Sequence, residues 1–327
     1  MTYHFRPAAT SEAKPLVGLY AESGCGKTKS ALLLAKGFVG DMSKVGMIET
    51  ESGRGEAFAD DQEVGGYCVL PLRTSFAPKE YGKAISAAEA AGLKALIIDS
   101  ASHEWEGVEG VLAMAAENQA SGKKGPLVWQ KPKIEHAREF MLRLTQTPIP
   151  LVIACMRAKY PMYEVTAAHA RKWEDAGRPG GKPPKVGEWA RSWELEPKQS
   201  ADILFEMFIH GWIDAEHKFH GTKYTVDALR KAFIDGEPIS VETGRRLAAW
   251  AGARTVAPKP APAAQPEEGV EYVTPDQVAN IETICQDSGF PIADFKAKAG
   301  IERVAMLRAD RYEKAVEWLK KAAKVAA

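Results

Sequence analysis

A glycine-rich stretch near the start of the chain has the residue types needed to hold phosphate. It runs Ala21-Glu22-Ser23-Gly24-Cys25-Gly26-Lys27-Thr28, between an apolar run at 16–20 and a helix-like run at 30–36. A turn that joins a strand to a helix directs backbone N–H groups and the positive end of the helix dipole at one point. Lys27 would place its ammonium on the β- and γ-phosphates of ATP, and the Thr28 hydroxyl would ligate Mg²⁺. The residues expected to bind the nucleotide are Glu22, Ser23, Gly24, Cys25, Gly26, Lys27, Thr28 and Lys29.

The stretch matches a Walker A motif with one departure, because Ala21 stands where the motif's first glycine usually lies. Alanine is small enough to let the loop close, so we expect the change to be tolerated.

Carboxylates follow two apolar runs that are typical of buried strands. The continuous run 95–98 ends in Asp99, which is predicted to be the Walker B acid that supports a Mg²⁺-bound water. The run 45–48 leads to Glu49 and Glu51, which share one face of an extended chain, so either could polarise the water that attacks a γ-phosphate. The alternative is that one of the two only pairs with Arg54 or a lysine.

Further polar residues follow at the same expected edge of the sheet. Glu104 is a rival catalytic carboxylate, and His103 could sense the γ-phosphate, although a hydrogen-bonded loop histidine is the more common role. The apolar run 149–156 predicts the next buried strand, whose end delivers Arg157 and Lys159 towards the nucleotide. A cation there could contact the γ-phosphate, and a plain surface charge is the alternative.

Composition bounds the class of protein. The chain has 327 residues, 45% of them hydrophobic, which is enough for one large α/β core and a small second unit. No apolar run approaches the roughly 20 residues that span a bilayer, and the first residues lack the apolar centre of a signal peptide, so we expect a cytoplasmic protein without a membrane partner. The 4 cysteines show no C-x-x-C spacing, which argues against a zinc site or a disulfide framework.

Nucleic-acid affinity would have to come from local patches, because the formal net charge is 0. Residues 119–138 place lysines and an arginine around Trp129, with a solvated loop around a packed tryptophan as the alternative. Residues 160–200 lose regular patterning and include Arg178, Lys182, Trp189 and Trp193, which predicts a long loop that binds single-stranded DNA. Several acidic residues dilute the charge of this second stretch.

The chain changes character twice along its length. Residues 1–252 are expected to form an α/β domain, in which 203–209 resumes the sheet, 218–225 is the second arm of a β-hairpin and a helix at 243–251 closes the core. Residues 253–271 are rich in proline and alanine and predict an extended linker. Residues 272–327 begin with the helix start Thr274-Pro275-Asp276-Gln277 and predict a small all-α module that binds a partner.

The residues 21–28, the strand end 48–51 and the run 96–100 together resemble the RecA-type ATPase core over roughly residues 14–250. The resemblance is closest to compact phage RecA-like ATPases associated with single-strand annealing, and residues 99–107 are also similar to phage nucleotide-binding proteins labelled AAA. The module after residue 272 resembles the small helical tails of several phage recombination proteins. The resemblance implies a RecA-like P-loop fold, with a mainly parallel sheet flanked by helices.

The resemblance also implies roles for particular residues. It favours Glu51 over Glu49 or Glu104 as the catalytic base. It implies a homo-oligomer that shares its nucleotide between neighbouring subunits, where Lys218 or Lys223 could reach across the interface. RecA-type cores usually carry an amide where this chain has Arg157, so coupling of nucleotide to DNA would have to pass through that arginine.

The expected function is therefore Mg²⁺-dependent ATP hydrolysis by a RecA-like protein that acts on single-stranded DNA in phage-type recombination or annealing, in the host cytoplasm. Lys27, Glu51 and Asp99 are the expected catalytic residues, and Thr28 and Asp99 the expected Mg²⁺ ligands. The alternative is a nucleotide-dependent assembly or regulatory ATPase that does not act directly on DNA. A small-molecule kinase is disfavoured because the chain has no obvious arginine-rich lid.

Overall fold

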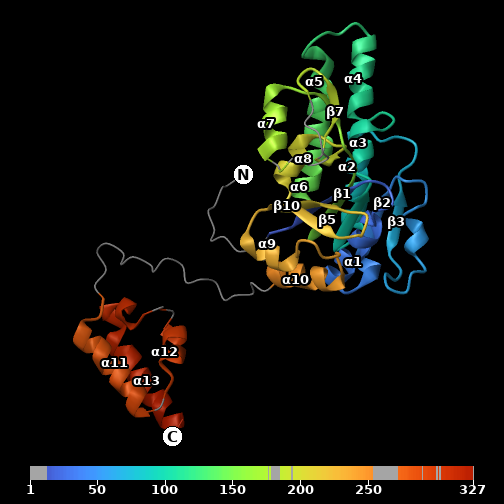
Figure 1. Ribbon diagram of the computed structural model, residues 1–327. Helices are drawn as coiled ribbons and strands as arrows, with labels where there is room; N and C mark the ends of the chain where they lie inside the picture. The colour runs from blue at the N-terminus through green and yellow to red at the C-terminus, as the bar shows by residue number, and fades with distance from the viewer. Residues whose placement is uncertain are drawn as a thin grey trace. The chain divides into compact units, whose positions relative to one another are not determined.

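The structure is a computed structural model that describes residues 13–252, with gaps at 176, 178–184 and 193, and residues 272–326, with gaps at 289, 300 and 302. The described residues divide into two compact units, one within 13–252 and one within 272–326 (Figure 1). The predicted linker at 253–271 lies outside the described residues, and each unit is considered by itself.

A mainly parallel β-sheet forms the centre of the first unit. Its strands are β1 (Leu16–Ala21), β2 (Val45–Glu49), β3 (Cys68–Pro71), β4 (Ala95–Asp99), β5 (Leu151–Lys159), β9 (Ile209–Ile213) and β10 (Phe219–Tyr224). They lie in the order β10-β9-β1-β5-β4-β2-β3, and β10 is antiparallel to β9 while the other neighbours are parallel. A short strand, β8 (Glu196–Pro197), pairs antiparallel with the end of β5. The expected α/β class with a mainly parallel sheet is confirmed.

Helices cover both faces of this sheet. One face packs against α1 (Lys27–Val39), α9 (Asp227–Ala232) and α10 (Val241–Gly252), of which α1 and α10 lie together at the lower edge of the first unit in Figure 1. The other face packs against α2 (Pro78–Ala90), a π-helical turn (His136–Met141), α6 (Leu142–Gln146) and α8 (Ala201–Glu206).

Successive residues of β4 belong to different cores, because side chains alternate across a strand. Ile97 is buried in the cluster under α1, and its neighbours Leu96 and Ile98 are buried in the cluster under α2. A strand covered on both faces needs an unbroken apolar run, which is why this segment was recognisable from its sequence.

The run 203–209, whose apolar pattern predicts a strand of the sheet, is mostly helical. The Ser200 side chain accepts a hydrogen bond from the backbone N–H of Asp202 at 3.3 Å and so caps the start of α8. Ile203 packs against the sheet from that helix, and β9 begins only at Ile209. The expected strand was wrong because a short apolar run reads the same in a buried helix as in a strand.

The stretch expected to be a pattern-free loop at 160–200 contains regular structure in its described part. Strands β6 (Met162–Glu164) and β7 (Trp189–Arg191) pair antiparallel as a two-stranded ribbon, and α7 (Ala167–Asp175) lies between them in the chain. Arg178, Lys182 and Trp193 lie outside the described residues. The first basic stretch is also more regular than expected, because α4 (Val111–Ala120) is followed by α5 (Leu127–Glu135), which carries Trp129 on a helix.

The second unit is built from α11 (Pro275–Ser288), α12 (Ile292–Ala299) and α13 (Tyr312–Ala326), with 3₁₀ turns at Val304–Met306 and Ala309–Arg311. The backbone N–H of Thr274 donates to Gln277 Oε1 at 2.9 Å and the N–H of Gln277 donates to Thr274 Oγ1 at 3.4 Å, which is a capping box at the start of α11. Its small core includes Ile281, Phe295 and Leu319.

Within the described part of the chain, no helix is long and apolar enough to cross a membrane. Cys25, Cys68, Cys155 and Cys285 are free thiols.

Candidate functional site

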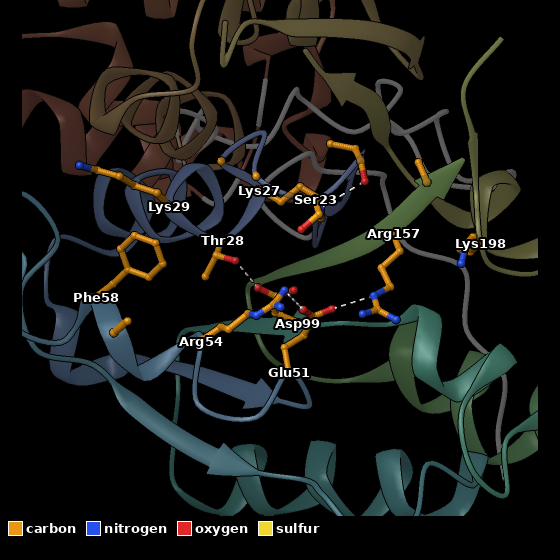
Figure 2. Close-up of a pocket in the computed structure, with 15 residues that line it drawn as sticks. Ser23, Lys27, Thr28, Lys29, Glu51, Arg54, Phe58, Asp99, Arg157 and Lys198 are labelled. Atoms are coloured by element: carbon orange, nitrogen blue, oxygen red, sulfur yellow. Dashed lines mark hydrogen bonds and ion pairs between the residues drawn. The ribbon is translucent and has the colours of Figure 1, made fainter. Parts of the chain in front are cut away.

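The glycine-rich loop borders a pocket of about 650 Å³ at the carboxyl edge of the parallel strands (Figure 2). Strand register explains the gathering, because Ala21 at the end of β1 pairs with Arg157 of β5, and Cys155 of β5 pairs with Asp99 of β4. Of the residues proposed from the sequence, the pocket is lined by Ser23, Gly24, Gly26, Lys27, Thr28, Lys29, Glu51, Asp99 and Arg157. The structure therefore brings residues from four distant segments of the chain to one site.

The loop backbone has a conformation that requires glycine at two positions. Gly24 and Gly26 have φ angles of 87° and 85°, in the left-handed region. A Cβ added at Gly26 would lie 2.9 Å from Nδ1 of His217, so a side chain there would be both strained and crowded. Gly26 is also the N-cap of α1 and provides no side-chain cap, which leaves the first N–H groups of the helix without a side-chain acceptor.

The Lys27 ammonium lies over the loop. Its Nζ donates to the carbonyl oxygens of Ala21 at 3.2 Å and Glu22 at 3.1 Å. Carbonyl acceptors hold the ammonium at the pocket, and a phosphate oxygen would form a stronger, charge-assisted bond with it.

Thr28 and Asp99 meet directly, although 71 positions separate them in the chain. The Thr28 hydroxyl donates to Asp99 Oδ2 at 2.6 Å. Burial raises the pKa of the Asp99 carboxyl, the Thr28 hydrogen bond lowers it, and the nearby charge of Glu51 raises it. A cation would therefore be stabilised beside this carboxylate.

These two oxygens fit a Mg²⁺ ion that is held together with a nucleotide. Mg²⁺ commonly takes only one or two protein ligands and completes its shell with substrate phosphates and water. The described residues contain no group of three or more His, Cys, Asp or Glu side chains that could hold a metal ion by themselves.

The two carboxylates at the end of β2 occupy different environments. Glu51 lines the pocket, where its Oε1 accepts from Arg157 Nε at 3.0 Å and its Oε2 accepts from Arg54 Nη1 at 3.2 Å. Glu49 is fully buried and does not line the pocket. It accepts the backbone N–H groups of Glu51 at 2.8 Å and Gly53 at 3.0 Å, and pairs with Arg73 at 2.9 Å. Glu49 thus holds the turn that presents Glu51.

The rival candidates after β4 do not line the pocket. His103 Nδ1 lies 2.8 Å from Thr50 Oγ1, and burial lowers the pKa of its imidazole. Glu104 is fully buried, where it contacts His136 Nδ1 at 2.9 Å and accepts from Gln199 Nε2 at 3.3 Å. Burial raises the pKa of the Glu104 carboxyl. Both side chains form hydrogen bonds with neighbouring residues beside the pocket.

The remaining candidates have other partners. Glu22 is exposed and lies 3.7 Å from Arg191 of β7, and Cys25 packs partly against the core under α1. The Lys29 ammonium pairs with Asp61 at 3.2 Å and with Glu63 at 2.7 Å.

The late lysines do not line the pocket of their own chain either. Lys223 donates to the carbonyl oxygens of Leu204 and Phe205 at the end of α8. Lys218 lies exposed just before β10. Their predicted reach into a neighbouring subunit stays a prediction.

Sequence reasoning missed several residues that line the pocket, among them Arg54, Phe58, Lys198, Ala57 and Ala158. The glycines around Arg54 indicate a turn at the end of β2, so that turn could have been proposed as part of the site. Phe58 follows in the 3₁₀ turn Glu56–Phe58. Nothing local identifies Lys198, because only the pairing of β8 with β5 brings it to the pocket.

A scan against models of protein families finds no match for this sequence, and a search of curated proteins finds no similar protein. The geometry of the pocket is therefore what indicates its function.

Proposed function

We propose that the first unit binds ATP with Mg²⁺ and hydrolyses its γ-phosphate. The observation that carries this proposal is the 2.6 Å hydrogen bond between Thr28 and Asp99, in a pocket that also presents Lys27 and Glu51. A hydroxyl and a buried carboxylate suit Mg²⁺, an ammonium and free helix N–H groups suit phosphate, and a further carboxylate suits a water nucleophile. A bound Mg²⁺ would neutralise charge on the transferring phosphoryl group.

The side chains of the pocket would each take one part of the reaction. Lys27 would exchange the carbonyls of Ala21 and Glu22 for phosphate oxygens and stabilise the charge that develops there. Arg157 now contacts Glu51, and an incoming γ-phosphate would compete for its guanidinium. Glu51 would then be free to orient a water molecule for attack.

The test is nucleotide binding by Lys27→Ala, with Lys94→Ala as the matched control. Lys94 is exposed and does not line the pocket, so both variants remove one lysine but only the first removes a phosphate ligand. We expect Lys27→Ala to lose ATP binding and phosphate release, and Lys94→Ala to retain both. Wild-type nucleotide affinity in folded Lys27→Ala would overturn the assignment.

We further propose that this ATPase is a RecA-like protein that assembles with copies of itself and acts on single-stranded DNA. The support for DNA binding comes from the ribbon of β6 and β7, where the large apolar side chains of Trp189 and Met162 are 68% and 57% exposed. Arg191 on the same ribbon lies 4.5 Å from the ring centroid of Tyr160 and 3.7 Å from Glu22 of the phosphate-binding loop. Exposed aromatic and basic side chains can stack bases and follow a phosphate backbone.

The experiment is ATP hydrolysis with and without single-stranded DNA at two salt concentrations, because phosphate contacts weaken as salt rises. Trp189→Ala should reduce DNA affinity by roughly 5- to 150-fold, since stacking of one base contributes about 1–3 kcal/mol. Hydrolysis that ignores DNA would refute the DNA-coupled part and leave the nucleotide site standing.

The second candidate function is a regulatory or assembly ATPase that does not act on DNA. Two ion pairs near the ribbon favour this alternative, because they reduce the positive charge available to DNA phosphates. Lys172 pairs with Glu194 at 2.7 Å, and Lys185 Nζ lies 4.0 Å from Glu188 Oε1. In that case the helical unit at 272–326 would bind the protein partner. Pull-down of a partner by the full chain but not by a chain ending at residue 252, together with no DNA binding, would support this alternative.

A further inference from the structure

We infer that Lys198 contacts the γ-phosphate and lets the protein distinguish ATP from ADP. This inference rests on the proposed ATP site and extends it to a residue far along the chain. Lys198 lines the same pocket as Lys27, Glu51 and Asp99, and its side chain is 31% exposed. The side chain is therefore partly buried at the wall of the pocket.

The backbone fixes Lys198 beside Arg157. The N–H of Lys198 donates to the carbonyl oxygen of Arg157 at 2.7 Å, directly after the pairing of Ala158 with Pro197 between β5 and β8. The next side chain, Gln199, donates to the carbonyl oxygen of Ala101 at 2.7 Å and so ties the segment to the end of β4. Lys198 cannot leave the pocket wall without breaking these bonds.

The position of Lys198 corresponds to the terminal phosphate. In Figure 2, Lys29 and Phe58 lie on one side of the Thr28–Asp99 pair, and Arg157 and Lys198 lie on the other. The aromatic side chain offers an apolar surface for a base, so a phosphate chain that starts near it and passes Thr28 would end towards Arg157 and Lys198. A cation at this end is sensitive to the γ-phosphate and not to the rest of the nucleotide.

The present partner of Lys198 is one that a phosphate can replace. Lys198 Nζ lies 3.3 Å from Glu106 Oε1, and the Glu106 side chain is 24% exposed. Both side chains keep some contact with solvent, which weakens their ion pair. A γ-phosphate carries more charge and more acceptor oxygens than one carboxylate, so it would draw the ammonium away from Glu106.

Lys198 and Arg157 flank the segment of the chain that carries the ribbon of β6 and β7. They stand at the two ends of this excursion, 158–197. A γ-phosphate held by both cations would bridge their side chains at the base of the excursion, and hydrolysis would remove that bridge while the pairing of β5 with β8 persists. Nucleotide state would thereby change the side-chain contacts at the base of the segment that carries Trp189.

The experiment measures the affinities of ATPγS and ADP for wild type, Lys198→Gln and the matched control Lys159→Gln. Lys159 is exposed, lies at the end of β5 and does not line the pocket, so both variants lose one charge in neighbouring segments. We expect Lys198→Gln to bind ATPγS about tenfold or more weakly, which corresponds to loss of one charge-assisted hydrogen bond. Its ADP affinity should stay at the wild-type value, and Lys198→Arg should restore most of the ATPγS affinity.

The possible results distinguish a failure of the proposed Lys198 contact from a failure of the proposed ATP site. A wild-type protein that binds neither nucleotide refutes the ATP site itself. Normal nucleotide binding with an unchanged ratio of ATPγS to ADP affinity in Lys198→Gln refutes only the role of Lys198. An equal loss for ATPγS and ADP would also overturn it, because Lys198 would then contact the inner phosphates or support the fold.

Discussion

Substitutions of the two carboxylates at the end of β2 should affect different properties, with Glu49→Gln lowering stability and Glu51→Gln lowering catalysis. Glu49→Gln replaces a fully buried carboxylate that accepts two backbone N–H groups and pairs with Arg73. The amide retains one acceptor oxygen, but its NH₂ group faces a backbone donor and leaves Arg73 without its buried partner. Hydrogen bonds to a charged group contribute about 1.5–3 kcal/mol each, and Arg73 is 39% exposed and can return to water.

We therefore expect Glu49→Gln to lower the free energy of unfolding of the first unit by about 3 kcal/mol. For a domain of this size the loss corresponds to a fall in Tm of roughly 6–12 °C. Nucleotide turnover below the transition should fall less than in Glu51→Gln, because Glu49 supports the turn that presents Glu51 but does not line the pocket itself.

Glu51→Gln should show the opposite behaviour. Its partners Arg157 and Arg54 are 43% and 69% exposed, so removing the charge should cost less than about 1 kcal/mol of stability. Loss of the water-orienting carboxylate should reduce hydrolysis by about 10²–10⁴-fold while ATP binding persists. The assay pairs thermal unfolding with single-turnover phosphate release. A stable but inactive Glu49→Gln, together with an active Glu51→Gln, would refute the assignment of the two roles.

Two further predictions concern metal and pH. Asp99→Asn should weaken ATP binding about tenfold or more in Mg²⁺ but little in EDTA, because it removes a ligand of the ion and not of the phosphates; titrations with and without the metal check this. Burial, and then the charge of Lys223, lowers the pKa of His210 to about 4, so the unfolded chain binds this proton between pH 6.5 and 4 while the folded chain does not. Stability from this residue is therefore complete above pH 6.5 and lost as the pH falls towards 4, by at most about 3 kcal/mol. Urea unfolding across this range should show a flatter pH dependence in His210→Leu than in wild type, and equal slopes would contradict the prediction.

Much of the first unit could be predicted from short stretches of sequence, because strand burial and helix capping depend on residues that are close together in the chain. The strand β4 was recognisable because a strand covered on both faces needs an unbroken apolar run, and Asp99 at its end followed from the same pattern. The helix α1 ends with Gly40 as its C-cap at a φ of 78°, a conformation for which a glycine in the sequence is the local signal. The capping box at Thr274 likewise depends only on neighbouring residues.

Other features were misassigned where local patterns are ambiguous. The run 203–209 is too short for its period to distinguish a helix from a strand, and the Ser200 cap decided for α8. The ribbon of β6 and β7 joins residues more than two dozen positions apart, so no window of sequence contains both strands. Its mixed polar and aromatic composition is typical of loops as well as of exposed strands.

The sequence by itself determined the glycine-rich loop, the acid at the end of β4 and the α/β class, because each depends on a short run of residues whose spacing specifies a backbone conformation. Strand periodicity left Glu49 and Glu51 equivalent, and the tertiary structure places Glu51 at the pocket and buries Glu49. It also decided that Lys198 stands beside Arg157, because that contact arises from strand pairing across a long excursion and leaves no local trace.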